Sequence, residues 1–280
     1  MDIKRTVLWV VFSVSLLFLW DSWMRHNGKQ SMFFPTPTSQ VKQAAPVGNG
    51  KTDVPQATAA NAANSTPASV PGAAAPAKGE IITITTDMVK ADIDTLGGEL
   101  VRLELLHHKD IVDPTKNVVL FDRSATRTYL AQSGLIGGQF PTHKSPFTAL
   151  PGPRALDNGN EVKLVLESQE GGVKLTKTYT FHRGDYVIGM RNDVTNVGTA
   201  PVTPSLYLQL VRDGSKPEGE TRFYSTFTGL AVYTEAEHFQ KIAFDKIGSG
   251  KDEHATKADN GWIAILQHYF VSAIIPPEHS

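Results

Sequence analysis

The sequence of 280 residues contains no cysteine. Disulfide scaffolds, cysteine metal sites and thiol catalysis are therefore excluded. A surplus of positive charge is also missing, because 27 Lys and Arg oppose 28 Asp and Glu for a net charge of −1. Binding to the phosphates of a nucleic acid depends on a basic excess or a basic stripe, so we expect no nucleic-acid partner.

Long hydrophobic runs are scarce, and the one that stands out lies close to the N-terminus. As a helix, the 19 residues Thr6–Met24 would span roughly 28 Å, close to the ~30 Å hydrocarbon core of a bilayer. Lys4 and Arg5 precede the run and predict a cytoplasmic N-terminus, while Trp20 and Trp23 suit the outer headgroup level. These four side chains form the predicted interface of a membrane anchor.

A cleaved signal peptide is the alternative interpretation of this run, and it requires small residues shortly after the apolar stretch. The sequence instead continues Trp-Asp-Ser-Trp-Met-Arg, without an Ala-x-Ala site. A buried core helix is disfavoured as well, because the segment is apolar around its whole circumference and precedes a long linker. We therefore predict an uncleaved transmembrane anchor over residues 1–28, with the chain from about residue 25 onward on the side of the membrane opposite the cytoplasm.

The next segment, residues 29–79, has the composition of a spacer. Between Pro35 and Gly79 there is no Leu, Ile or aromatic residue, whereas seven Pro and twelve Ala occur in 45 residues. Such a chain buries too little apolar surface to offset its loss of conformational entropy, and its prolines interrupt every candidate helix. The sequence therefore predicts a disordered, extended linker that carries no chemistry.

From Glu80 onward the hydrophobic period changes to two, which is typical of half-buried antiparallel strands. Apolar and polar residues alternate over Ile82–Thr85, Val101–Leu105, Val173–Phe181 and Leu206–Leu210. Turn-forming residues separate the strands at Gly97–Gly98, Asp157–Gly159, Gly171–Gly172, Arg183–Asp185 and Asn196–Gly198. We therefore predict an all-β domain over residues 80–280, in the form of a large antiparallel β-sandwich.

One residue and one short segment of this domain depart from the simple strand pattern. Lys177 lies on an otherwise apolar strand face, and we expect its amine to reach a rim or to line a cleft. The residues Thr234–Phe239 predict one short helical turn.

Motifs that would carry chemistry are incomplete. The segment Gly248–Lys251 resembles a phosphate-binding loop, but Asp245 and Asp252 stand where that loop requires Gly and Ser or Thr. The acidic segment Asp92–Asp94 resembles the start of a calcium loop, but Leu103 occupies the position of the bidentate Glu. We therefore expect a turn at the acidic segment and no phosphate site at the glycine-rich one.

The nine histidines are scattered without metal-ligand spacing. His107 and His108 are adjacent, so on a strand they point to opposite faces and cannot bind one metal ion together. Neither Gly-x-Ser-x-Gly nor His-Glu-x-x-His occurs. We expect no catalytic residue, no cofactor-binding residue and no metal site, and therefore no enzyme.

A series of short stretches gives the chain a family resemblance. The chain begins Met-Asp-x-Lys-Arg, followed by the apolar run and the Pro/Ala-rich linker. Further matching stretches are Thr86–Asp87, Asp94–Gly98, Tyr129–Leu135, Lys177–Tyr179, Arg183–Tyr186, Phe227–Gly229, Ala231, Tyr233, Gly261–Phe270, Ser272–Ala273 and Pro276. Their order and spacing resemble the YidC-type bacterial membrane protein insertases, over the anchor and nearly all of residues 80–280.

The resemblance implies a twisted supersandwich of the galactose-mutarotase-like type, held at the bacterial inner membrane by the first helix. It implies three partners: the lipid bilayer, the Sec translocon and nascent integral membrane proteins. In the family, insertion is carried out by a later core of five transmembrane segments with an arginine-bearing groove. No segment after Trp20 is apolar enough to span again, so we expect an N-terminal portion that anchors and docks but does not insert, with the sandwich incomplete at its C-terminus.

Two other functions remain open at this point. The first is a membrane-anchored sugar-binding protein or mutarotase-like enzyme, which would need an acid and a base that converge on the sugar. The second is a passive scaffold of an envelope complex. Fold analogy alone does not decide between these functions and the insertase component.

Overall fold

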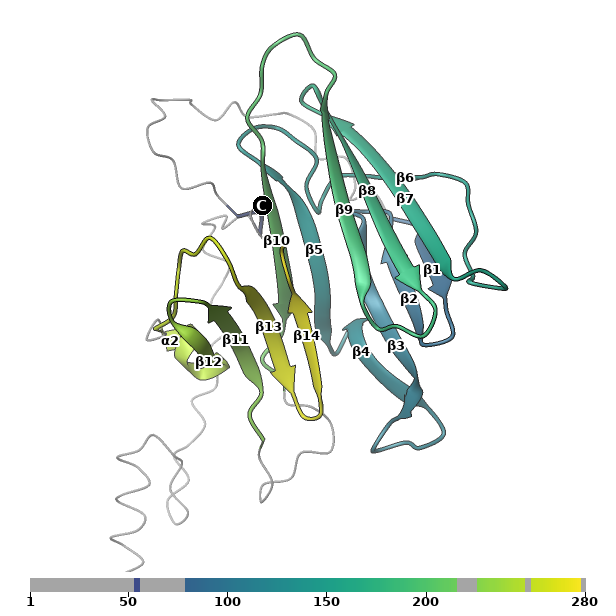
Figure 1. Cartoon of the computed structure of the whole chain (residues 1–280), viewed down its shortest axis with the longest axis vertical. Helices are drawn as coiled ribbons and strands as arrows, with labels where there is room; N and C mark the ends of the chain where they lie inside the picture. The colour runs from purple at the N-terminus through teal and green to yellow at the C-terminus, as the bar shows by residue number, and fades with distance from the viewer. Residues whose placement is uncertain (1–52, 56–78, 216–225, 250–252, 278–280) are drawn as a thin grey trace, which may run out of the picture. The chain divides into compact units, whose positions relative to one another are not determined.

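A computed structural model of the chain describes residues 53–55, 79–215, 226–249 and 253–277 (Figure 1). Within these ranges the chain forms fourteen β-strands and one six-residue helix, α2 (Phe244–Ser249). None of the helical segments among these residues has the length and hydropathy to cross a membrane. The predicted anchor over residues 1–28, with Lys4, Arg5, Trp20 and Trp23, lies outside the described residues, as does nearly all of the predicted linker.

The largest sheet has six strands in the order β1-β2-β3-β4-β5-β10, and all of its neighbours are antiparallel. Short connections join most of them, since five of the six follow one another in sequence. The strands are β1 (Ile81–Thr85), β2 (Val89–Asp94), β3 (Glu99–Lys109), β4 (Asn117–Arg123), β5 (Thr128–Ile136) and β10 (Ser205–Arg212).

A second sheet has four antiparallel strands in the order β6-β7-β8-β9. Its strands are β6 (Thr148–Ala149), β7 (Glu161–Glu170), β8 (Val173–His182) and β9 (Ile188–Asn196). A third sheet has the order β12-β11-β13-β14, with β11 (Gly229–Thr234), β12 (His238–Ala243), β13 (Trp262–Gln267) and β14 (Phe270–Ile274).

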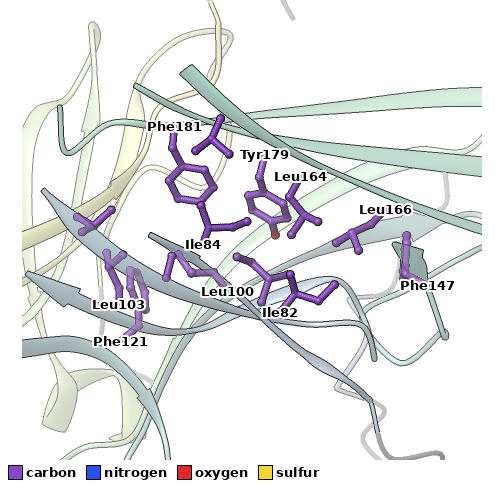
Figure 2. Close-up of a cluster of buried hydrophobic side chains, with 14 of the residues drawn as sticks. Ile82, Ile84, Leu100, Leu103, Phe121, Phe147, Leu164, Leu166, Tyr179 and Phe181 are labelled. Carbon is purple, nitrogen blue, oxygen red and sulfur yellow. The ribbon is translucent and has the colours of Figure 1, made fainter. Parts of the chain in front are cut away.

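The hydrophobic core lies between the six-stranded sheet and the β6–β9 sheet. Figure 2 shows side chains of the first sheet, among them Ile84 and Leu103, facing Leu164 and Phe181 of the second. Strand β7 alternates between exposed and buried positions along most of its length, so its inward residues meet the core and its polar residues meet water. The predicted all-β class with antiparallel sheets is confirmed for the described residues, and two facing sheets fit a β-sandwich.

The predicted helical turn at Thr234–Phe239 is wrong. Strand β11 ends at Thr234 and pairs with β12 from His238 onward, so the segment is a β-hairpin. The Thr234 hydroxyl accepts a hydrogen bond from the amide of Glu237 at 3.0 Å and stabilises the turn. The helical residues follow β12 instead, in α2.

Candidate functional site

Lys177 on β8 occupies the inward position that its neighbours Val173 and Phe181 also occupy, and it is fully buried. The amine neither reaches a rim nor lines a cleft, so that expectation is wrong. Its Nζ donates hydrogen bonds to two carbonyl oxygens of the six-stranded sheet region, that of Gly97 at 2.6 Å and that of Ser133 at 2.9 Å. The buried lysine therefore links the two sheets of the sandwich.

Two carbonyl groups that accept hydrogen bonds from side chains of β8 belong to the two-glycine turn between β2 and β3. Gly97 and Gly98 have φ angles of 81° and 57°, a conformation that favours glycine. The turn directs the Gly97 oxygen to Lys177 and the Gly98 oxygen to the hydroxyl of Tyr179, which donates to it at 2.7 Å. A Cβ atom on Gly97 would lie 2.1 Å from the carbonyl oxygen of His143, so the turn has no room for a side chain.

Charged and amide side chains form a second part of the cluster. Glu99 and Asp94 are paired across β3 and β2, both are buried, and Arg123 of β4 contacts both carboxylates. Gln132 of β5 donates to Glu99 at 2.6 Å and accepts from Gln209 of β10. This network crosses five strands of the six-stranded sheet, and because its members are hydrogen-bonded it stabilises a single register.

Burial shifts the ionisation of both central groups. It raises the pKa of Glu99 from 4.5 to about 7, although Gln132 and Arg123 stabilise the carboxylate. It lowers the pKa of Lys177 from 10.5 to about 7, against the attraction of Glu99. The two groups therefore change charge in the same pH range, and the charged form of each favours the charged form of the other.

This cluster is closed to substrates. Glu99 and Lys177 are 4% and 0% exposed, so neither can meet a sugar or a peptide bond in this conformation. Two shallow surface hollows in the described part of the chain are lined by other residues, one around Glu167 and Lys174 and one around Thr83 and Arg154. The arrangement can hold sheets together, and it offers no acid and base that converge on an open site.

The remaining candidate motifs have structural roles where they are described. The acidic segment Asp92–Asp94 is the end of strand β2, and the expected turn follows it directly at Thr95–Gly98. Its Asp92 accepts a hydrogen bond from Thr83 at 2.6 Å. Gly248 and Ser249 close α2, while the following residues 250–252 lie outside the described ranges. Over the residues that the structure describes, no three acidic or histidine side chains are grouped so that they could hold a metal ion.

The adjacent histidines both lie on β3. The ring of His107 makes a hydrogen bond with the carbonyl oxygen of Asp87 at 2.9 Å. The ring of His108 instead packs against Tyr186, with 5.7 Å between ring centroids, and against Phe270, at 5.6 Å. The two adjacent rings therefore have different partners.

Lys177 stands out in the sequence as an anomaly, whereas Glu99 and Asp94 do not. Extending the alternation of Val101–Leu105 back along β3 would reach Glu99. The register of the pairing between β2 and β3 shifts between Asp92 and Ile93, however, so the alternation does not continue unchanged to Glu99. Such a bulge changes the strand face on which the preceding residues lie, and alternation alone does not reveal it.

Comparison with known proteins identifies the relatives of the chain. Residues 81–280 match the family described as YidC periplasmic domain. The membrane protein insertase YidC of Janthinobacterium sp. (strain Marseille) is 59% identical over 284 residues, covering 99% of this chain and 50% of the relative. The proteins of the same name from Herminiimonas arsenicoxydans and Cupriavidus taiwanensis are 55% and 53% identical, over all of this chain and 50% and 51% of theirs.

The chain thus spans about half the length of the curated relatives that it matches. The matched family covers the whole β-rich region, including the Gly97–Gly98 turn and the strand that carries Lys177. The chain belongs to the YidC periplasmic domain family.

Proposed function

We propose that this protein takes part in the insertion and folding of integral membrane proteins at the bacterial inner membrane. The observation that carries the proposal is the identity of 59% to a membrane protein insertase over 99% of this chain, the apolar run and the linker included. The proposal is not based on fold analogy alone, because that match extends beyond the β-rich domain.

Within this function, we assign anchoring and docking to the 280 residues. The apolar run Thr6–Met24 holds the chain in the membrane, with Lys4 and Arg5 on the cytoplasmic side and Trp20 and Trp23 at the outer interface. Residues 29–79 act as the spacer, and residues 80–280 act in the periplasm as a supersandwich of the galactose-mutarotase-like type. The Sec translocon and nascent membrane proteins are the proposed partners.

We assign the insertion step to the half of the relatives that this chain does not match. After residue 24 the sequence has no further run with the length and hydropathy of a membrane span, so it offers no intramembrane groove for a client helix. The sandwich itself keeps its charged groups sealed, as Glu99 and Lys177 illustrate. Its surface and not its interior must therefore meet the partners.

A depletion experiment tests this division of labour. Cells depleted of their own insertase receive either the 280-residue chain or the full-length relative from Janthinobacterium as the matched control. We expect growth and client insertion to return with the relative and not with the chain alone. Growth restored by the chain alone would refute the assignment of insertion to the unmatched half.

Crosslinking separates docking from a passive scaffold. The chain contains no cysteine, so single cysteines on its surface allow site-specific crosslinking in membranes. We expect translocon subunits to be captured by some of these positions. If all surface positions capture only unrelated envelope proteins, the scaffold alternative replaces the docking assignment.

A further inference from the structure

Several reverse turns at one end of the sandwich expose apolar side chains. The turn after β3 carries Ile111 and Val112, the turn after β8 carries Tyr186 and Val187, and the turn after β13 carries Tyr269 (Figure 1). Val187 and Tyr269 are 68% and 70% exposed, which is far more than such residues usually are in a folded domain. We call these five residues the apolar tips.

Contacts between the turns hold the apolar tips in one place. The His108 ring lies 5.7 Å from the ring of Tyr186 and 5.6 Å from that of Phe270, so it joins the end of β3 and the start of β14 to the turn after β8. The carboxylate of Asp87, in the turn between β1 and β2, accepts the amide hydrogen of Gly184 at 2.9 Å. The tips are therefore a fixed feature of the fold and not three independent loops.

The backbone of two turns is satisfied from within. The Asp110 carboxylate accepts the amide hydrogens of Val112 at 2.8 Å and Asp113 at 2.9 Å. In the same way Asp185 accepts the amide hydrogen of Val187 at 2.9 Å. Each turn thus presents its apolar side chains outward while these backbone donors are paired with a side chain of the same turn.

We propose that the apolar tips rest in the headgroup region of the lipid bilayer, and so orient the domain against the membrane. The side chains stand on separate, protruding turns, whereas a protein partner would need a matching pocket for each. A fluid lipid surface fills the gaps between protruding side chains. Two of the five tips are tyrosines, and Tyr is a residue type that is enriched at the membrane–water interface.

The proposed anchor makes weak insertion sufficient, and the inference rests on that anchor. The 55 residues 25–79 separate the predicted span from the domain, and a flexible chain of that length has an end-to-end distance of roughly 40 Å. The tips therefore stay within reach of the bilayer at a high effective concentration, so a weak membrane affinity of their own is sufficient.

Strand β9 offers a matched pair of positions for the test. Val187 precedes the nine-residue strand at the apolar tips, and Val197 follows it, ten residues and roughly 30 Å away. Both are exposed valines in turns. Because the chain has no cysteine of its own, a single Val187→Cys, Ile111→Cys or Val197→Cys substitution is introduced into the whole chain, and the new thiol is labelled with a polarity-sensitive dye.

The labelled chains are reconstituted into liposomes of phosphatidylethanolamine and phosphatidylglycerol, with or without nitroxide-headgroup lipid. We expect a blue shift and a loss of about half the emission to the nitroxide at positions 187 and 111, and neither change at position 197. Equal responses at positions 187 and 197, or a label at 187 that stays in water, would overturn the inference. A shift at 187 that appears only after membrane proteins are added would identify a protein partner instead of lipid.

Flotation of the same liposomes separates this inference from the proposed anchor. Chains that float while the labels at 187 and 111 stay in water retain the anchor and refute the role of the tips. Chains that do not float refute the anchor, and the labels at 187 and 111 then decide the role of the tips when an excess of liposomes is added.

Discussion

A folded domain usually buries apolar side chains and exposes charged ones. The buried cluster around Lys177 and the apolar tips around Val187 depart from this rule in opposite directions. In the first, charged side chains lie inside, and in the second, apolar side chains lie outside. Lys177 has two carbonyl partners and Glu99 has Gln132 and Arg123, so the interior violation is resolved within the chain. The tips are held in place at their base, but their apolar ends face water. This exposure indicates a surface that binds another partner.

The largest expected effect is a loss of stability, and it is tested by substituting two glycines, one from each region. Gly97→Ala places a Cβ 2.1 Å from the His143 carbonyl oxygen in a positive-φ turn, and it should lower the free energy of unfolding by about 4 kcal/mol. Gly184→Ala has a similar φ of 73° but nothing within 4 Å, so it should cost only about 1 kcal/mol. Urea denaturation of the whole chain in mild detergent, followed by circular dichroism, measures both.

Similar losses at the two glycines would contradict the comparison, because they would mean that backbone strain and not the packing of the cluster determines the cost. A large loss at Gly97 alone would locate the rigid part of the fold at the β2–β3 turn.

The second prediction concerns pH. The folded-state pKa of Glu99, about 7, lies above the ordinary value of 4.5, so the folded chain retains a proton that the unfolded chain has lost between these values. Stability from this group is therefore complete below pH 4.5 and is lost as the pH rises to about 7, by on the order of 2–3 kcal/mol. Glu99→Gln should flatten this part of the stability profile. A Val187→Ser control in the tips should leave the profile unchanged, and a Glu99→Gln profile as steep as that of the unaltered chain would refute the assignment.

The third prediction isolates the lysine amine. Lys177→Met keeps most of the side-chain volume but leaves the Gly97 and Ser133 oxygens without this donor, at a cost of about 2 kcal/mol at neutral pH. The lowered pKa of Lys177 means that stability rises with pH between about 7 and 10.5, and the variant should lose that slope. A variant as stable as the unaltered chain would mean that the cost of burying the amine cancels its hydrogen bonds.

Much of the fold follows from local rules that the sequence displays. Strands β1, β3 and β8 were predictable from alternation, and the glycine pairs marked the turns, because both signals depend on neighbouring residues only. Lys177 was visible as an exception for the same reason. Its partners were not, since Gly97 and Ser133 lie 80 and 44 residues away and depend on how the sheets meet.

Other features of the sites depend on geometry that no local pattern contains. Glu99 was hidden by the shift in pairing between β2 and β3. The apolar tips combine residues from turns that lie far apart in sequence, so each turn alone is an ordinary exposed loop. The Thr234–Phe239 segment has helix-forming residues, but pairing between β11 and β12 overrides that local preference.

The smallest expected effect concerns the ion pair between Asp53 and Lys144. The two side chains are 77% and 51% exposed and their charged atoms lie 3.0 Å apart, so water and salt screen most of the attraction. A double-mutant cycle of Asp53→Ala and Lys144→Ala should give a coupling energy of about 0.3 kcal/mol. A coupling energy above about 1 kcal/mol would instead indicate that Asp53 is held on the surface of the domain by this contact. The spacer would then shorten from 55 residues to the 28 residues 25–52, with an end-to-end distance of roughly 30 Å, and the apolar tips would be held still closer to the bilayer.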